Sequence, residues 1–157
     1  MAEHSLITPE IRAVIGRVSG PFELDVSRAS CRAFARAVGY ANPIFYDVDA
    51  AHSEGYRDIP APPGYLGTWP WSPSHPENRQ FVEEVPTSLA RRLNGGTELE
   101  YHSTPCAGDT LHVSGRIVRV DARETSLGST LIVSREVEYR NADGDLVAVL
   151  RGTSLRY

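Results

Sequence analysis

Apolar and polar positions follow a helical period in the first forty residues of the chain. Thr8-Pro9-Glu10 combines an N-cap residue, a proline at the first helical position and an acid in the first turn, so a short helix ending near Gly16 is predicted. Phe22–Val26 is predicted to be a short strand. Ser27 then caps a second helix, which ends at Gly39. Its apolar residues have helical spacing and are expected to form a buried stripe: Cys31, Phe34, Ala35 and Val38.

The segment that follows is predicted to be extended at first and then briefly helical. Tyr40–Tyr46 is expected to be extended, because Pro43 disfavours helix at the residue before it. Asp47 fits the N-cap of one further helical turn, which ends at Gly55.

The middle of the chain is rich in proline, tryptophan and glycine. Residues 58–76 hold six prolines and both tryptophans. This stretch is predicted to be either an irregular lid or the entry to a central helix. A helix start is expected near Pro63–Leu66, with Pro70 ending or kinking the helix. Pro86–Leu93 is predicted to be a further helical piece.

From Thr97 onward the pattern changes to the two-residue alternation of strands. Four strands are predicted: Thr97–His102, Thr110–Val120, Ser129–Arg140 and Leu146–Arg156. One face of the third strand is mostly apolar and consists of Leu131, Val133, Arg135, Val137 and Tyr139. Turn residues at Ala107-Gly108-Asp109 and Asn141-Ala142-Asp143-Gly144 separate the strands. We therefore expect a meander of antiparallel strands packed against a helix, an α+β fold.

Composition and charge narrow the class of protein. The chain has 157 residues, 41% of them hydrophobic and 23% charged, which is ordinary for one globular domain. A net charge of −4 without basic runs argues against nucleic acid as a partner. No apolar run approaches the ~20 residues that span a bilayer, and the first residues lack a signal-peptide pattern, so a cytoplasmic location is expected. Cys31 and Cys106 have no metal-like spacing and are expected to be reduced thiols, with a disulfide as the alternative.

Three segments resemble the MaoC-like dehydratase/(R)-specific enoyl-thioester hydratase family. Gly39–Phe45 (G-Y-A-N-P-I-F) resembles the signature G-D-x-N-P-[LIV]-H. Ile59–Leu66 resembles the family's run into its central helix, and Tyr101–Asp109 resembles the strand and turn that follow. The resemblance extends from Thr8 to Tyr157. The subgroup it indicates is the N-terminal-type half-domain, including the non-catalytic subunit of heterodimeric 3-hydroxyacyl-ACP dehydratases.

The resemblance implies a single hotdog domain over residues 1–157, an antiparallel sheet wrapped around a central helix. Two such domains would pair edge to edge and place their sites at the interface. In the family, an Asp and a His of the signature hold a water and move its protons to and from an enoyl or 3-hydroxyacyl thioester. A backbone N–H near Gly64 would face the charge that develops on the carbonyl. We expect no cofactor and no metal.

The sequence departs from the family at its two catalytic positions. Tyr40 stands where the family has Asp, and Phe45 stands where it has His. A phenyl ring cannot move a proton, and a tyrosine with a pKa of about 10 is a poor base at neutral pH. The chain is therefore not expected to run the family's reaction by the family's mechanism.

Six residues are nevertheless expected to contact substrate: Tyr40, Asn42, Phe45, Gly64, Tyr65 and Trp69. Asn42 is equally well explained as a turn residue before Pro43. Trp69 and Trp71 either form the wall of an acyl tunnel or pack in the core or a dimer interface.

Other polar residues fit a structural role better than a catalytic one. Asp47 and His52 repeat the five-residue Asp-to-His spacing of the signature, but Asp47 already fits a helix cap. His102, on a predicted strand, is expected to be a structural histidine. Cys31 lies on the apolar stripe of a helix and is expected to behave as a small hydrophobe rather than a nucleophile.

The function expected from these observations is that of a hydro-lyase subunit acting on 2-enoyl and 3-hydroxyacyl thioesters of CoA or acyl carrier protein. The chain would form a homodimer or a heterodimer with a catalytic MaoC-like subunit that supplies the Asp and His. A repurposed homodimeric thioesterase, isomerase or cyclase is the enzyme alternative, with Tyr40, Asn42 or His102 as its polar groups. A protein that only binds an acyl thioester or another small apolar ligand is the non-enzyme alternative.

Overall fold

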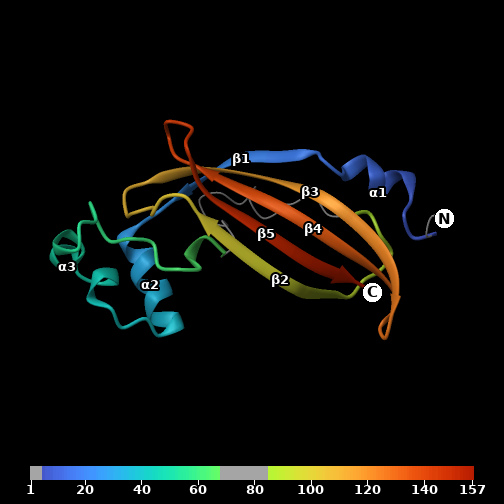
Figure 1. Ribbon diagram of the computed structural model, residues 1–157, viewed down its shortest axis with the longest axis horizontal. Coiled ribbons are helices and arrows are strands. Elements are labelled where there is room, and N and C mark those ends of the chain that lie inside the picture. Colours follow the sequence, from blue (N-terminus) through green and yellow to red (C-terminus); the bar gives the residue numbers. More distant parts are fainter. Residues whose placement is uncertain (1–4, 68–84) are drawn as a thin grey trace.

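Five antiparallel strands form one curved sheet in the computed structural model, which describes residues 5–67 and 85–157 (Figure 1). The strands are β1 (Val18–Asp25), β2 (Arg92–Tyr101), β3 (Thr110–Thr125), β4 (Gly128–Arg140) and β5 (Leu146–Arg156). Their order across the sheet is β1-β3-β4-β5-β2, so β1 and β2 are its two edges.

The predicted strands are confirmed, but their expected order needs one correction. β5 has the predicted bounds, and β4 begins one residue earlier than expected, at Gly128. β3, β4 and β5 form the expected meander. β2 does not continue it, because the other side of β3 is already paired with β1, for example through Phe22 and Val113. β2 therefore pairs with β5 on the far side of the sheet.

Among the described residues, three short α-helices precede β2 in the sequence, and their predicted N-caps are confirmed. They are α1 (Pro9–Val14), α2 (Arg28–Val38) and α3 (Val48–Ser53). The hydroxyl of Thr8 accepts a hydrogen bond from the N–H of Ile11, and the side chains of Ser27 and Ser30 form a capping box on α2. α2 ends at Gly39, whose φ of 78° lies in the left-handed region that glycine tolerates best. Figure 1 shows α2 and α3 together beyond one end of the sheet.

Two local predictions around α2 are wrong. Tyr40–Tyr46 is not extended throughout, because Pro43–Phe45 forms the 3-10 turn η1. A proline restricts only the residue before it, and Asn42 is indeed extended, while Pro43 itself begins a helical turn well. Val38 was assigned to the buried stripe but is 50% exposed, so α2 buries its face mainly through Cys31 and Ala35.

The predictions of a central helix and of a helical piece after it have different outcomes. The described part of the expected central helix is the 3-10 turn η2 (Tyr65–Gly67), and the continuation of that helix lies outside the described residues. The prediction of a helix at Pro86–Leu93 is wrong. Residues 86–91 have no helix, and the backbones of Arg91 and Tyr157 exchange two hydrogen bonds where β2 begins.

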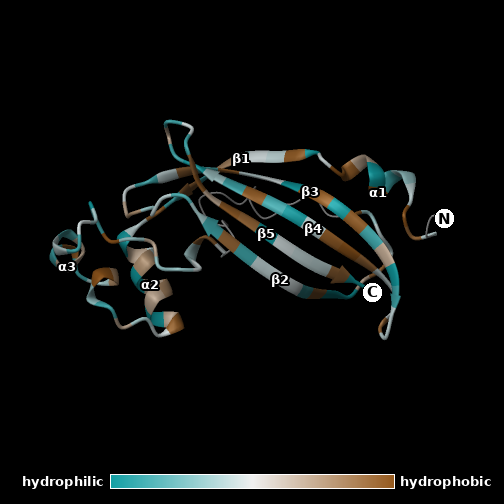
Figure 2. Ribbon diagram, in the orientation of Figure 1, coloured by the Kyte–Doolittle hydropathy of each residue, from teal (hydrophilic) through white to brown (hydrophobic). Residues whose placement is uncertain are grey.

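The core lies on one face of the sheet, called here the inner face. On β4 the predicted apolar row is confirmed, with Leu131, Val133, Val137 and Tyr139 buried and Arg135 partly buried. The opposite, outer face carries charged residues, so hydrophobic and hydrophilic bands alternate along the strands in Figure 2. The inner face thus offers the apolar wall on which a site can be built.

Candidate functional site

The two positions that the sequence aligns with the family's catalytic pair lie side by side. The rings of Tyr40 and Phe45 have their centroids 5.6 Å apart. The hydroxyl of Tyr40 donates a hydrogen bond to the carbonyl oxygen of Pro63 at 3.3 Å. The loop after α2 therefore contacts the Pro63–Gly67 segment, and the pair presents an aromatic surface with a single hydroxyl.

Gly64 occupies a conformation that few other residues adopt. Its φ is +87°, and a Cβ at this position would lie 3.6 Å from Cζ of Phe34. The next residue, Tyr65, is buried, and its ring meets Phe34 edge to face at 5.9 Å. Tyr65 and Ser30 share a hydroxyl–hydroxyl hydrogen bond of 2.8 Å, which anchors the segment to α2. Burial raises the pKa of Tyr65, so its hydroxyl stays protonated.

Two further tyrosines approach the same segment from the sheet, and the sequence analysis did not assign them to the site. Tyr139 on β4 donates a hydrogen bond to the carbonyl oxygen of Leu66. Burial raises the pKa of Tyr139 far above its ordinary value. The only local signal was its place in the apolar row of β4, where a tyrosine needs a partner for its hydroxyl.

Tyr101, the last residue of β2, is the second of these tyrosines. Burial raises the pKa of Tyr101, while the nearby backbone N–H groups of Gly64 and Leu66 act in the opposite direction. The rest of the side chain is more open, because 39% of the residue is exposed. The N–H that the family resemblance assigns to a substrate carbonyl therefore lies near a hydroxyl of the chain itself.

Asn42 has the role of a turn residue. Its side-chain oxygen accepts a hydrogen bond from the N–H of Ile44 at 3.1 Å and caps η1. The side chain of Asn42 is exposed, and its contact with substrate stays a prediction. Trp69 and Trp71 lie outside the described residues.

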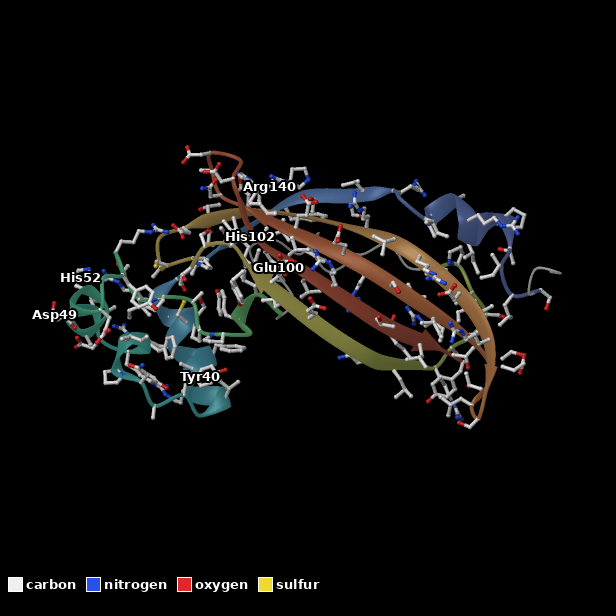
Figure 3. All side chains as sticks on the ribbon, viewed as in Figure 1. Tyr40, Asp49, His52, Glu100, His102 and Arg140 are labelled. Atoms are coloured by element: carbon white, nitrogen blue, oxygen red, sulfur yellow. The ribbon has the colours of Figure 1, made fainter. Side chains whose placement is uncertain are left out.

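The alternative Asp and His pair does not join the site. Asp47 caps α3 by accepting a hydrogen bond from the N–H of Ala50 at 2.8 Å. His52 contacts the carbonyl oxygen of Arg57 at 3.1 Å. In Figure 3, His52 and Tyr40 lie on different parts of the helical end, and His102 lies by the sheet, apart from both. His102 is 3.6 Å from a carboxylate oxygen of Glu100, an exposed pair in keeping with a structural role.

Ion pairs hold the segments that carry the family motifs together. Arg28 on α2 binds Asp58 through two hydrogen bonds of 2.9 and 2.7 Å. The hydrogen bond to Arg28 is the largest of the effects that lower the pKa of Asp58 to about 2. Arg57 pairs with Asp109, whose carboxylate also accepts a hydrogen bond from the N–H of Cys106. The predicted turn role of Asp109 is therefore confirmed.

Neither cysteine has the environment of a nucleophile. Cys31 and Cys106 are both free and buried, so the expected thiols are confirmed and the alternative disulfide is absent. Burial raises the pKa of Cys31 to about 11, which keeps the thiol protonated at neutral pH.

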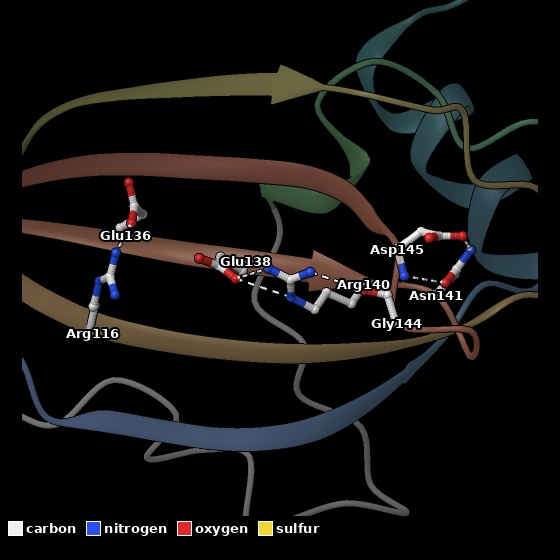
Figure 4. A network of polar contacts seen from close by, with 7 residues as sticks. All are labelled: Arg116, Glu136, Glu138, Arg140, Asn141, Gly144 and Asp145. Carbon is white, nitrogen blue, oxygen red and sulfur yellow. Dashed lines mark hydrogen bonds and ion pairs between the residues drawn. The ribbon is translucent and has the colours of Figure 1, made fainter.

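The outer face of the sheet carries paired charges rather than a reaction centre. Arg116 binds Glu136 at 2.7 Å, and Arg140 binds Glu138 at 2.7 Å (Figure 4). Within residues 5–67 and 85–157, no three His, Cys, Asp or Glu side chains are placed to hold a metal ion. No helix of the described chain is long and apolar enough to cross a bilayer.

Comparisons with known proteins agree with this architecture. The family model "FAS1-like, dehydratase domain region" matches residues 13–150. A UPF0336 protein of Parafrankia sp. is 33% identical over 141 residues, which cover 85% of this chain and 87% of that protein. Among solved structures, the HadBC (3R-hydroxyacyl-ACP dehydratase) complex of Mycobacterium tuberculosis matches with a TM-score of 0.74 and 26% identity, covering 90% of this chain and 96% of the matched one. A second M. tuberculosis protein, with a double hotdog fold, matches with a TM-score of 0.65 and 19% identity over 94% of this chain and 44% of its own.

Proposed function

Because the chain belongs to the MaoC-like hotdog dehydratase family, we propose that it is the non-catalytic subunit of a hydro-lyase. The enzyme would interconvert 2-enoyl and 3-hydroxyacyl thioesters of CoA or acyl carrier protein. A catalytic MaoC-like partner would supply the Asp and the His, and this chain would supply one wall of the acyl site and half of the interface.

The observation that carries this proposal is the contact between Tyr40 and Phe45. Hydration of a conjugated double bond needs one group that takes a proton from water and one that delivers a proton to the α-carbon. Phe45 has no exchangeable proton. The hydroxyl of Tyr40 donates a hydrogen bond to the carbonyl oxygen of Pro63, and a tyrosine is in general a poor base at neutral pH.

The surroundings of Gly64 support the same conclusion. An oxyanion donor must point at the place where the carbonyl oxygen of the substrate becomes negative. Here the hydroxyl of Tyr101 lies near the N–H of Gly64, where it competes with a substrate carbonyl. The chain thus lacks an acid and a base at the positions of the family's site.

The exposed edge of the sheet supports the assignment to a complex. β2 is an edge strand, and of its ten residues only Leu99 is not exposed. An unpaired edge of this length favours pairing with another chain. The HadBC dehydratase, to which this chain is similar, is itself named as a complex.

Co-purification and a rate assay test the proposal. We expect the chain to co-purify with a MaoC-like protein encoded beside it, and the complex to hydrate crotonyl-CoA. The chain alone should show only the background rate, because general acid and base groups typically contribute ~10²–10⁴-fold each. Replacing the partner's Asp or His should abolish the activity of the complex. Robust turnover by the unmodified chain alone would overturn the proposal and favour a repurposed homodimeric enzyme.

A further inference from the structure

The two edge strands of the sheet differ in how well they can accept a strand from another chain. β1 is interrupted by Pro21, which has no N–H to donate, and its register with β3 shifts between Ser19 and Phe22. Among the described residues, β2 has a single neighbouring strand, β5, and pairs with it in regular register from Gly96 to Tyr101. The edge of the sheet along this run of β2 is therefore the better place for a partner strand.

The same run carries two carboxylates on the outer face of the sheet. Glu98 lies opposite Arg151 of β5, and Glu100 points to the same face two residues further along. Arg151 contacts three carboxylates: Glu100 at 2.8 Å, Glu136 at 3.3 Å and Glu98 at 3.8 Å. Arg116 also binds Glu136, so two arginines meet three glutamates in this network. The hydrogen bond from Arg151 lowers the pKa of Glu100, so its carboxylate is charged at neutral pH.

A second copy of the chain would bring these carboxylates face to face. Two identical strands that pair around a twofold axis run antiparallel, and residues directly opposite each other share a face of the sheet. Two such registers pair most of the run Gly96–Tyr101 with itself. One places Glu98 opposite Glu98 of the other copy, and the other places Glu98 opposite Glu100. Like charges at opposed positions destabilise a strand pair, whereas a lysine or an arginine at these positions would stabilise it.

The end of this run borders the candidate site. Tyr101 is the last residue of β2, and its hydroxyl lies near the N–H of Gly64. A Cβ at Gly67 would lie 3.8 Å from Cδ1 of Leu99, so the inner face of the run also contacts η2. A strand added along Gly96–Tyr101 would therefore run past the segment that carries Gly64.

We propose that the β2 edge binds the edge strand of a different protein, which carries lysine or arginine opposite Glu98 and Glu100, and that these two glutamates disfavour pairing with a second copy of this chain. This inference rests on the proposed function, in which a catalytic partner completes the enzyme. It assigns the interface to one edge of the sheet and gives the facing strand of the partner a positive charge. The exposed side chains of Glu98 and Glu100 are placed to meet that charge.

Charge reversal on the chain itself tests the assignment without the natural partner. The double variant Glu98→Lys with Glu100→Lys should have an edge complementary to that of the unmodified chain. Sedimentation velocity with one fluorescently labelled component should show a mixed dimer at least about tenfold tighter than the dimer of the unmodified chain, a factor equal to ~1.4 kcal/mol. The mixed dimer should weaken as salt rises from about 50 mM to about 500 mM, because screening reduces the attraction. A mixture that associates no more tightly than the unmodified chain, or a tight dimer of the unmodified chain alone, would overturn the proposal.

Two further variants separate the effect of charge from an effect on folding. Glu98→Gln with Glu100→Gln removes the repulsion without adding a charge, and this variant should self-associate more tightly than the unmodified chain. Glu23→Lys with Asp25→Lys makes the same change of charge on β1 and is the matched control, whose mixture with the unmodified chain should not associate more tightly. Circular dichroism checks that each variant is folded. A neutral variant that self-associates no better than the unmodified chain, or a control mixture as tight as the test mixture, would contradict the assignment.

The two proposals fail in different ways. An active complex that assembles equally well with the Glu98→Lys and Glu100→Lys double variant removes the inference about the β2 edge and leaves the proposed function standing. Charge-dependent pairing at β2 in a chain whose complex never hydrates a thioester removes the proposed function and leaves the assignment of the edge.

Discussion

The hydroxyl of Tyr139, near the end of β4, donates a hydrogen bond to the carbonyl oxygen of Leu66, 73 positions earlier in the chain. Tyr40 donates to the carbonyl oxygen of the neighbouring Pro63, and the hydroxyl of Tyr101 lies near the N–H groups of Gly64 and Leu66. Three tyrosines from separate elements therefore meet at the backbone around Gly64, where the family resemblance expects a substrate carbonyl.

Removal of the Tyr139 hydroxyl should destabilise the fold. In Tyr139→Phe the buried carbonyl of Leu66 loses its partner, and an unsatisfied buried acceptor costs about 1–3 kcal/mol. We expect the free energy of unfolding, measured by urea titration, to fall by this amount. Tyr157→Phe is the control, because it keeps the ring that lies 6.0 Å from the guanidinium of Arg91. Equal stability of Tyr139→Phe and the unmodified chain would contradict the prediction.

The same residue should make the protein sensitive to alkali. Burial raises the pKa of Tyr139 above its ordinary value of 10.0, so in this range the unfolded chain loses the proton first. Its contribution to stability is complete below pH 10.0 and decreases as the pH rises above that value. Urea titrations from about pH 8 to about pH 11 should show this loss, with a smaller slope in Tyr139→Phe. A pH-independent free energy of unfolding over this range would show that burial does not protect the Tyr139 hydroxyl from deprotonation.

Local sequence patterns were sufficient for most strands and caps. Leu146–Arg156 alternates between two faces and follows a turn rich in Asn, Asp and Gly, so its bounds could be predicted from the sequence. The start of β2 could not, because its residues have little burial on either face and so no clear alternation. Pro86–Leu93 contains residues that favour a helix, yet the pairing of Arg91 with Tyr157 decides the structure there. Pairing with a distant strand outweighs a weak local propensity.

Only the part of the candidate site that lies within the family signature could be predicted from the sequence. The contact of Tyr40 with Phe45 follows from the family signature, which places both residues in one short loop. The contact of Tyr101 with Gly64 joins the end of β2 to a segment nearly forty residues earlier in the chain. It depends on β2 crossing the sheet to pair with β5, which no local pattern indicates.

Asp58 should titrate well below an ordinary aspartate. Its pKa is about 2 instead of 3.8, mainly because its carboxylate accepts hydrogen bonds from Arg28. The stabilisation that this pair provides is present above pH 3.8 and is lost as the pH falls through about 2. In Arg28→Gln the carboxyl should titrate closer to 3.8, as followed by NMR. Arg12→Gln, on the separate helix α1, is the control, and an unchanged Asp58 midpoint in Arg28→Gln would refute the assignment.

Restoring the family's catalytic pair should require removal of the Tyr101 hydroxyl as well. Tyr40→Asp with Phe45→His would return an acid and a base, but the hydroxyl of Tyr101 would still lie near the N–H of Gly64 and compete with the substrate carbonyl. Adding Tyr101→Phe removes this competing hydroxyl and leaves the N–H to the substrate carbonyl, and one oxyanion donor is worth about 10²–10³-fold in rate. We therefore expect the triple variant to hydrate crotonyl-CoA at least about tenfold faster than the double variant, even if the new groups are imperfectly placed. Tyr101→Phe alone serves as the control and should remain at the background rate. A double variant as fast as the triple variant would show that Tyr101 does not occupy the oxyanion position.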